Sequence, residues 1–277
     1  MIQAVFFDID GTLRDFKEQR LSEDTKRALA LARRAGLYVS VATGRHWLEI
    51  EEEGLLGEER FDAYVTVTGQ LCYTCPRTEG VKPPGRPVHK NPIPPEQVER
   101  LLELLGREPF PCVFLEEDRM YMNYADSLVR REQEAIGTRI PPAGDIRRAL
   151  HHPVYQIVPY GGPGVQEKVQ AVMKGCACVT WHGGMAADVI PGDGSKTAGI
   201  QAVMKGWGLE LQDAAAVGDG GNDVDMLRRA GLGIAMGNGC RAAKEAAGYI
   251  TGQIGRGGLT QAVEYILAQN RREAAKG

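Results

Sequence analysis

The strongest chemical signal in the sequence is a pair of carboxylates near its beginning. Asp8 and Asp10 are two residues apart, follow a short apolar run and precede Gly11 and Thr12. Side chains two apart on a strand point to the same side, and the glycine turn behind them exposes both. Carboxylates repel one another, so such a pair is favourable only where a cation or a proton-transfer step holds it together. A plain Asp-Gly turn is the alternative for this motif taken alone.

A second acidic motif follows another apolar run, at residues 218–223. Asp219 stands between glycines, and Asp223 follows at the start of a predicted helix. Asp223 could simply cap that helix. An acid at the end of each of two strands nevertheless provides oxygen ligands suited to Mg²⁺, which prefers carboxylates and retains several waters. We therefore predict a magnesium site formed by the two acidic motifs.

Two further motifs have the character of phosphate binders. Thr43, Gly44 and Arg45 follow a β-branched run, where a hydroxyl and main-chain N–H groups would meet a phosphate at a helix start. Lys196 opens a predicted helix after a glycine-rich turn, but Ser195 stands where a Walker A loop requires glycine. Each motif is weak alone, and a solvated lysine is the alternative for Lys196. Together the four motifs indicate phosphate chemistry.

The elements that must position these motifs alternate between strand and helix. Apolar runs at 3–8, 37–42 and 63–68 predict buried strands, with a helix from Ser22 to Arg34 between the first two. The alternation returns near the C-terminus, with elements predicted at 188–190, 196–207, 214–218, 223–230, 232–236 and 259–270. Strands separated by helices form parallel βαβ units, whose carboxyl ends share one edge of the sheet. Ligands bind outside that edge, where all four motifs fall.

The middle of the chain has a different pattern. Seven of the 15 prolines fall between Pro76 and Pro95, which predicts an extended connector or hairpin. Beyond it, strands predicted at 112–116, 120–123, 155–159 and 178–181 mix with helices predicted at 95–105, 125–136 and 165–174. We interpret residues 85–186 as an inserted α+β cap domain. Residues 1–84 and 187–277 then form one discontinuous α/β core.

On these motifs, the chain resembles the haloacid dehalogenase superfamily phosphatases of the Cof type over nearly its whole length. The matching segments are D-I-D-G-T at 8–12, A-T-G-R at 42–45, Lys196 within S-K-T, G-D-G-G-N-D at 218–223 and A-M-G-N at 235–238. The resemblance implies a Rossmann-like parallel-sheet core and a mobile α/β cap inserted after the third strand. It also implies Mg²⁺ as the cofactor and hydrolysis of phosphomonoesters.

The resemblance further implies a role for each residue of these motifs. Catalysis would rest on Asp8 as the nucleophile that forms an aspartyl-phosphate, on Asp10 as acid and base, and on Lys196 as the neutralising cation. The residues expected to contact phosphate or substrate are Ile9, Thr43, Gly44, Arg45, Lys196 and Asn222. The expected metal residues are Asp8, Asp10 through its backbone carbonyl, Asp219 and Asp223. Asp223 would either bind the metal directly or orient Lys196.

The chain departs from the family pattern after the third predicted strand. Thr68-Gly69-Gln70 stands where many Cof-type chains have Asn-Gly, which leaves one phosphate-side contact open. Relatives that are dehalogenases or ATPases lack an acid at the position of Asp10, so Asp10 favours phosphatase or phosphomutase chemistry. Specificity is expected in the cap, and a structural role is the alternative for each candidate there. These candidates are Arg119, Tyr121, Asn123, Tyr124, Tyr155, Gln156 and His182.

Composition excludes several other classes of protein. The 277 residues are 43% hydrophobic and carry a net charge of −3, which indicates a globular chain without the basic patch of a nucleic-acid binder. No stretch approaches the roughly 18 apolar residues of a membrane span, and the N-terminus lacks the pattern of a signal peptide. We expect a cytoplasmic monomer or homodimer whose six cysteines are reduced thiols. A zinc site at Cys72, Cys75, Cys176 and Cys178 is the alternative, although the second spacing is short.

The sequence therefore predicts a Mg²⁺-dependent phosphatase for small phosphorylated metabolites, most simply sugar phosphates. A phosphomutase of the same superfamily is a close alternative, since it shares the nucleophile and the acid. A non-catalytic sensor of phosphorylated ligands belongs to another class. The intact set of Asp8, Asp10, Lys196 and Asp219 argues against a sensor, which needs no nucleophile and acid together.

Overall fold

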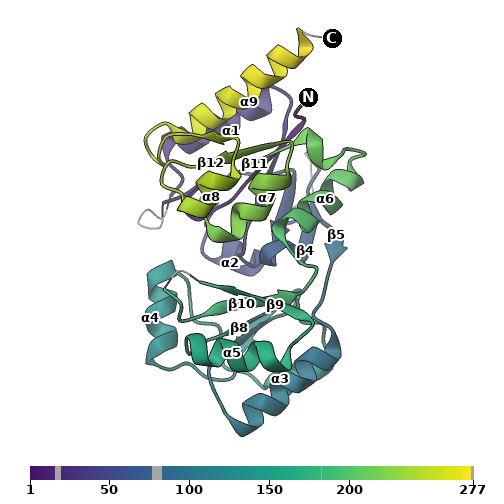
Figure 1. Ribbon diagram of the computed structural model, residues 1–277, viewed down its shortest axis with the longest axis vertical. Helices are drawn as coiled ribbons and strands as arrows, with labels where there is room; N and C mark the ends of the chain where they lie inside the picture. Colours follow the sequence, from purple (N-terminus) through teal and green to yellow (C-terminus); the bar gives the residue numbers. More distant parts are fainter. Residues whose placement is uncertain (16–19, 77–82, 182, 276–277) are drawn as a thin grey trace. The chain divides into compact units, whose positions relative to one another are not determined.

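The computed structural model describes residues 1–15, 20–76, 83–181 and 183–275. The chain forms two compact units (Figure 1). The first unit comprises Met1–His89 and Ser195–Gly277, and the second comprises Lys90–Gly194. The first unit thus contains both ends of the chain, and the second is one continuous insertion. His182, a predicted cap residue, lies outside the described residues.

The first unit is built on an eight-stranded sheet with the strand order β13-β12-β11-β1-β2-β3-β4-β5. The pairs from β13 to β3 are parallel, and β4 runs antiparallel to β3. This arrangement confirms the predicted α/β fold with a parallel-sheet core. The strands are β1 (Ala4–Phe7), β2 (Tyr38–Ala42), β3 (Ala63–Thr66), β4 (Leu71–Thr74), β5 (Arg86–Lys90), β11 (Ala214–Gly218), β12 (Leu232–Ala235) and β13 (Tyr249–Ile250).

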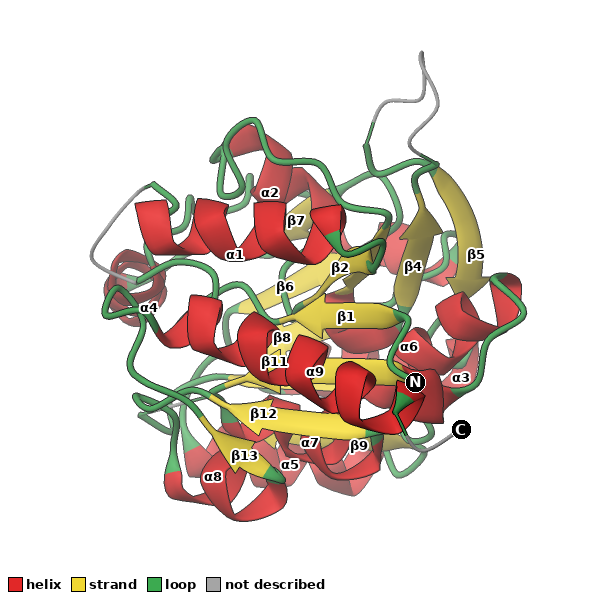
Figure 2. Cartoon of the chain, turned by 90° about the horizontal axis from the view of Figure 1, so that it is seen from above, coloured by secondary structure: helices red, strands yellow, loops and turns green. Residues whose placement is uncertain are grey.

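Helices cover both faces of this sheet, so its central strands are apolar on both sides. On one face, Ala4 and Phe6 of β1 belong to an apolar cluster with residues of α6 (Lys196–Gly206), α7 (Val224–Arg229) and α8 (Arg241–Ala246). On the other face lie α1 (Glu23–Arg34) and α9 (Gly258–Ala274), which pack against each other (Figure 2). The short helix α2 (Trp47–Glu52) follows β2. The carboxyl ends of the parallel strands remain as the edge where polar side chains can gather.

Capping side chains fix the starts of the two helices that matter most for the core. Ser22 accepts a hydrogen bond from the Thr25 N–H at the start of α1, as its sequence context predicts. Ser195 caps α6 in the same way by accepting from the Ala198 N–H. The cap makes Lys196 the first residue of α6 and fixes the direction in which its side chain leaves the helix.

The second unit has a five-stranded sheet with the order β7-β6-β8-β10-β9, and its described pairs are antiparallel. Its apolar core includes residues of α3 and α5 against one face of that sheet. The elements are α3 (Pro95–Arg107), β6 (Cys112–Leu115), β7 (Met120–Met122), α4 (Ser127–Ile136), β8 (Gln156–Pro159), α5 (Pro163–Val172), β9 (Cys176–Thr180) and β10 (Ala187–Pro191).

The boundaries of the two units differ from those expected from the sequence, which were 84/85 and 186/187. The apolar run at 188–190 was expected to return to the core sheet, but it lies in β10, which pairs antiparallel with β8 and β9 of the second unit. The chain re-enters the first unit at Ser195. At the other boundary, the stretch 76–95 that was predicted as a connector or hairpin contains β5, which lies beside β4 at the edge of the core sheet. An apolar strand has the same pattern in either sheet, so periodicity alone cannot assign its partner.

Within the described residues, no helix has the length and apolar character needed to cross a membrane.

Candidate active site

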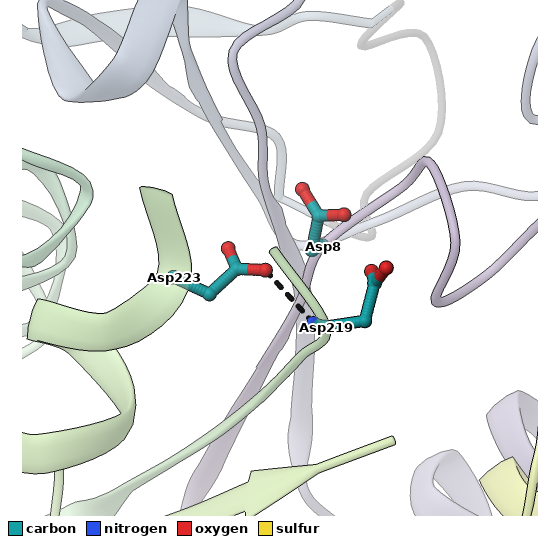
Figure 3. A group of neighbouring side chains, drawn as sticks. All are labelled: Asp8, Asp219 and Asp223. Carbon is teal, nitrogen blue, oxygen red and sulfur yellow. Dashed lines mark hydrogen bonds between the residues drawn. The ribbon is translucent and has the colours of Figure 1, made fainter. Parts of the chain in front are cut away.

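Parallel pairing brings the two acidic motifs together at the carboxyl edge of the first unit's sheet. In the β1–β11 ladder, Phe7 is opposite Val217, and the Asp8 N–H donates to the Val217 carbonyl at 2.9 Å. Asp8 and Asp219 therefore emerge side by side from neighbouring strands, and Asp223 approaches from the turn that follows (Figure 3). Carboxylate oxygens of these three residues lie within 4.8 Å of one another. The predicted juxtaposition of Asp8, Asp219 and Asp223 is thus present.

Lys196 is the cation at the centre of this group. Its Nζ lies 2.6 Å from Oδ1 of Asp8 and 2.7 Å from Oδ1 of Asp223. The lysine side chain is 1% exposed, so it is a buried counter-charge and not the solvated lysine that the sequence left as an alternative. Three carboxylates around one ammonium leave an excess of negative charge, which favours a further cation.

Asp223 has both carboxylate oxygens occupied by the protein. Oδ1 accepts from Lys196, and Oδ2 accepts from the backbone N–H groups of Asp219 at 2.9 Å and Gly220 at 2.8 Å. The side chain is fully buried. These contacts favour the second of its two expected roles, in which Asp223 orients Lys196 and shapes the loop that carries Asp219.

Asp219 is held from the opposite side by the first acidic motif. Thr12 Oγ1 donates to Asp219 Oδ1 at 2.9 Å. Gly11 has a φ of +87°, and a Cβ added there would lie 2.2 Å from Asp219 Oδ2, so this close approach requires glycine. The side chain of Asn238 donates to the Gly11 carbonyl at 2.7 Å and so ties the A-M-G-N segment to the same turn. Thr12 and Asn238 belong to the matching motifs, but the sequence assigned no role to either.

Asp10 points to a different set of partners from Asp8. Its Oδ2 accepts from Nε of Arg45 at 2.6 Å, and its Oδ1 lies 3.5 Å from Nε of Arg14. Arg45 also lies near Glu49, with 3.7 Å between Nη1 and Oε1. Both arginines are almost completely buried, so the ion pairs that they form with Asp10 are not exposed surface pairs. Arg14 was missed because nothing in the sequence distinguishes it from other arginines of a solvated turn.

Burial and the crowding of carboxylates shift the pKa values in this group. Burial raises the pKa of Asp8 well above its usual range, Lys196 opposes that shift, and Asp223 and Asp219 reinforce it. Burial and the neighbouring Asp223 raise the pKa of Asp219 to about 6. For Lys196, burial acts to lower the pKa, but Asp223 and Asp8 outweigh it and the net shift is upward. Shifts of this kind, at a strand edge, are a recognised mark of a functional site.

The predicted phosphate-binding residues surround the same edge. Thr43 directly follows β2, is 1% exposed, and accepts at Oγ1 from the Arg45 N–H at 3.1 Å. Gly44 stands between them in the loop, and Ile9 is buried between Asp8 and Asp10. Asn222 is exposed in the short 3₁₀ turn before Asp223. Ile9 and Asn222 lie on the two loops that carry the acidic groups, whereas Thr43 and Gly44 lie on the loop after the neighbouring strand β2.

A strained turn follows β3, the strand that pairs with β2, and so lies next to the loop that contains Thr43. Three consecutive residues have positive φ: Val67 at 51°, Thr68 at 53° and Gly69 at 93°. A β-branched residue in the left-handed region costs of order 1–3 kcal/mol, because Cβ crowds the backbone. Backbone hydrogen bonds hold the turn, since the Val67 N–H donates to the Arg45 carbonyl and the Thr68 N–H donates to the Thr43 carbonyl, each at 3.0 Å. A Cβ on Gly69 would lie 2.1 Å from the Ser195 carbonyl oxygen, so the turn is also packed against the start of α6.

Some of the predicted cap residues form hydrogen bonds inside the second unit, and others are exposed. Tyr121 donates to the buried Glu116 at 2.9 Å, and Asn123 bridges the backbone of Cys112 and Phe110, so both serve their own unit. Gln156 donates to Asp188 at 2.8 Å. Of the remaining described candidates, Arg119 and Tyr124 are exposed and Tyr155 is buried.

The cysteines do not form a cluster in the part of the chain that the structure describes. There, the sole group of three or more metal-binding side chains close enough to share an ion is Asp8 with Asp219 and Asp223. Cys72, Cys75 and Cys112 are buried, and burial raises the pKa of all three thiols. The described cysteines therefore give no support to the zinc alternative.

Comparisons with known proteins agree with this geometry. The model of the haloacid dehalogenase-like hydrolase family matches residues 5–263. "Putative phosphatase YkrA" of Bacillus subtilis is 30% identical over 267 residues, which cover 95% of this chain and 97% of that protein. An HMP-PP phosphatase of Yersinia pseudotuberculosis is 25% identical over 86% of this chain and 85% of its own length. A solved structure of a subclass IIB sugar phosphatase superposes with a TM-score of 0.81 at 28% identity, covering 95% of this chain and 98% of that one.

Proposed function

This chain belongs to the haloacid dehalogenase-like hydrolases, and we propose that it is a Mg²⁺-dependent phosphomonoesterase that acts through an aspartyl-phosphate. The observation that carries the proposal is the buried Lys196, shared by Asp8 and Asp223 beside Asp219. A phosphoryl group brings negative charge to a nucleophilic carboxylate, and a buried cation at that carboxylate offsets the repulsion.

The proposed first step uses Asp8 and Asp10. A carboxylate oxygen of Asp8 attacks phosphorus and forms an Asp8 O–P bond, while the bond from phosphorus to the ester oxygen breaks. The leaving oxygen takes a proton from Asp10. In the second step Asp10 takes a proton from a water, whose oxygen attacks the aspartyl-phosphate and releases inorganic phosphate and free Asp8.

Other residues of the first unit support these steps without exchanging atoms. Lys196 neutralises charge at Asp8, and Asp223 holds Lys196 in place through its own hydrogen bond. Arg45 and Arg14 fix the side chain of Asp10. Thr43 and the N–H of Gly44 contribute donors to the phosphoryl oxygens, with Ile9 and Asn222 as further contacts.

The residues present fit Mg²⁺ by their chemistry, because the cluster consists of carboxylate oxygens and holds more negative than positive charge. Asp8 and Asp219 would hold the ion, together with the backbone carbonyl of Asp10. When bound, the ion supplies neutralisation of the phosphoryl oxygens.

The substrate class rests on the relatives. One solved relative is a sugar phosphatase, and one curated relative is an HMP-PP phosphatase. Small phosphorylated metabolites cover both, and sugar phosphates are the first class to screen. The second unit is the proposed cap that selects among them.

Hydrolysis of p-nitrophenyl phosphate in the presence of Mg²⁺ tests the proposal. EDTA should abolish turnover, and so should Asp8→Asn. Asp225→Asn is the matched control, because Asp225 lies on α7 two residues after Asp223 and, among the residues described, forms an ion pair only with the exposed Arg229. Unchanged turnover in Asp8→Asn would overturn the mechanism. Transfer of phosphate to a second position of a sugar would indicate the phosphomutase, and tight binding of phosphorylated compounds without turnover would indicate the sensor.

A further inference from the structure

In the part of the chain that the structure describes, the turn after β3 contains a buried hydroxyl that lacks a partner. Thr68 is 4% exposed, and its Oγ1 is buried with no hydrogen-bond partner among the described residues. An unpaired buried hydroxyl is unfavourable, since it loses water without a replacement. The same residue also has a φ of 53°, which a β-branched side chain rarely adopts. Two independent sources of strain thus fall on one residue.

The position of Thr68 explains what this strain could serve. Its N–H donates to the carbonyl of Thr43, whose loop is expected to bind phosphate. The next residue, Gly69, lies directly against the carbonyl of Ser195, which precedes Lys196. Thr68 is therefore anchored between the two segments that flank Asp8, at the carboxyl edge of β3 next to β2. Strain in such a place is a reason to look for a function.

A less strained residue would be available if the turn were only structural. Glycine and asparagine tolerate the left-handed region, and neither introduces a β-branched side chain. Threonine adds what glycine lacks, a hydroxyl whose direction is fixed by a stiff χ1. A rigid hydroxyl that none of the described protein groups uses is suited to donate to a ligand.

We propose that Thr68 is a substrate-binding residue whose hydroxyl donates a hydrogen bond to an oxygen of the bound phosphoryl group. This rests on the proposed phosphatase function and adds a contact that the four motifs do not include. The strained backbone aims the hydroxyl, and the empty hydrogen-bonding capacity is filled when phosphate binds.

Four variants at this position separate the hydroxyl from the strain. Thr68→Ser keeps the hydroxyl and removes the branch, whereas Thr68→Val keeps the branch and removes the hydroxyl. Thr68→Gly removes both, and Thr68→Asn replaces the hydroxyl with an amide that tolerates the turn. Ser40→Ala is the matched control, because Ser40 Oγ is also buried without a hydrogen-bond partner among the described residues but lies inside β2.

The primary measurement is the affinity for inorganic phosphate or vanadate with Mg²⁺, taken from the ligand-induced rise in Tm. Hydrogen bonds to charged groups predict that Thr68→Val and Thr68→Gly weaken binding about 10- to 100-fold. Thr68→Ser and Ser40→Ala should bind as the wild type does, and Thr68→Asn should retain part of the affinity. Without ligand, Thr68→Gly should raise Tm by about 2–4 °C, as relief of backbone strain predicts.

The outcomes distinguish this contact from the function on which it rests. Equal phosphate affinity in Thr68→Ser, Thr68→Val and Thr68→Gly would overturn the assignment of the hydroxyl. Weakening in Ser40→Ala to the same extent would overturn it as well, because the effect would then come from general loosening. If the wild type binds phosphate but hydrolyses no ester, the phosphatase function fails, while the comparison among the Thr68 variants still decides the contact.

Discussion

Removing the ammonium group of Lys196 should expose how much of the first unit's stability depends on charge balance. In Lys196→Met the carboxylates of Asp8 and Asp223 lose the partner that lies 2.6 and 2.7 Å away. At an effective dielectric of about 20, each contact corresponds to roughly 6 kcal/mol of attraction before desolvation is subtracted. Breaking a buried pair in this way typically lowers the free energy of unfolding by about 3–5 kcal/mol, because a charge stays buried without compensation.

The pH and metal dependence of this loss are equally specific. Burial raises the pKa of Asp8, and Lys196 opposes the shift, so the variant should raise this pKa further. A carboxyl with a raised pKa in the folded state stabilises the fold at low pH and loses that contribution as the pH rises through the folded pKa. The deficit of Lys196→Met should therefore grow as the pH rises and shrink as the pH falls. Saturating Mg²⁺ should also reduce it, because the ion replaces the missing positive charge.

Urea denaturation of the whole chain at several pH values, with and without Mg²⁺, measures these effects. Lys205→Met is the matched control: Lys205 lies on the same helix, α6, but is exposed, so its loss should stay within about 0.5 kcal/mol. If Lys196→Met does not fold, the double variant Asp8→Asn with Lys196→Met should regain part of the stability by removing one charge of each sign. A deficit that equals that of Lys205→Met, or one that ignores pH and Mg²⁺, would refute the reasoning.

Three further predictions concern other contacts. Asp219 has a pKa of about 6, so thermal stabilisation by Mg²⁺ should be large at pH 7.5, where the carboxylate is ionised, and should fade below pH 6 as protons compete; a pH-independent rise in Tm would contradict this. Gly11→Ala should reduce the affinity for Mg²⁺, measured by calorimetry with titrated Mg²⁺, because the added Cβ displaces Asp219. Gly36 is the control: it has a similar φ of +80° and open space for a Cβ, so Gly36→Ala should leave the affinity unchanged and lower only the free energy of unfolding, by about 1 kcal/mol. Glu116 accepts hydrogen bonds from Tyr121 and Arg148, so Glu116→Gln should lower the local stability of the second unit, measured by amide hydrogen exchange, by about 1–3 kcal/mol. Glu117→Gln is the control, because Glu117 is 41% exposed and its loss should not change the protection. Equal protection in the two variants would contradict the role of Glu116 as a buried hydrogen-bond acceptor.

Much of the site was predictable because its chemistry is local in the sequence. Asp8 and Asp219 each follow an apolar run and precede glycine, and parallel pairing of β1 with β11 then necessarily places them side by side. Lys196 was predictable as a helix start because it follows a glycine-rich turn, and in the structure Ser195 caps that helix. In each case the residue type, the local turn and the predicted sheet edge indicate the same position for the functional side chain. Sequence patterns are reliable when such independent features agree.

The remaining features depend on contacts between distant segments. The pairing of Arg14 with Asp10 and the strained conformation of Thr68 leave no periodic trace in the sequence. The strand at 188–190 has the apolar pattern of a core strand, yet its hydrogen-bonding partners belong to the second unit. Tertiary pairing, which local propensity does not encode, decides such cases.

The interrupted layout of the first unit imposes an order of events during synthesis. The second unit is one continuous segment, and its strands pair only with one another among the described residues, so it can form as soon as Gly194 has left the ribosome. The strand β1, made first, receives its neighbour β11 only after most of the chain has been translated. Until then the apolar faces of β1 and β2 lack the cover of α6 and α7. Between the synthesis of Gly194 and that of β11, the nascent chain thus has a complete second unit and an incomplete first unit. A chaperone that recognises exposed strands would be of most use during this interval.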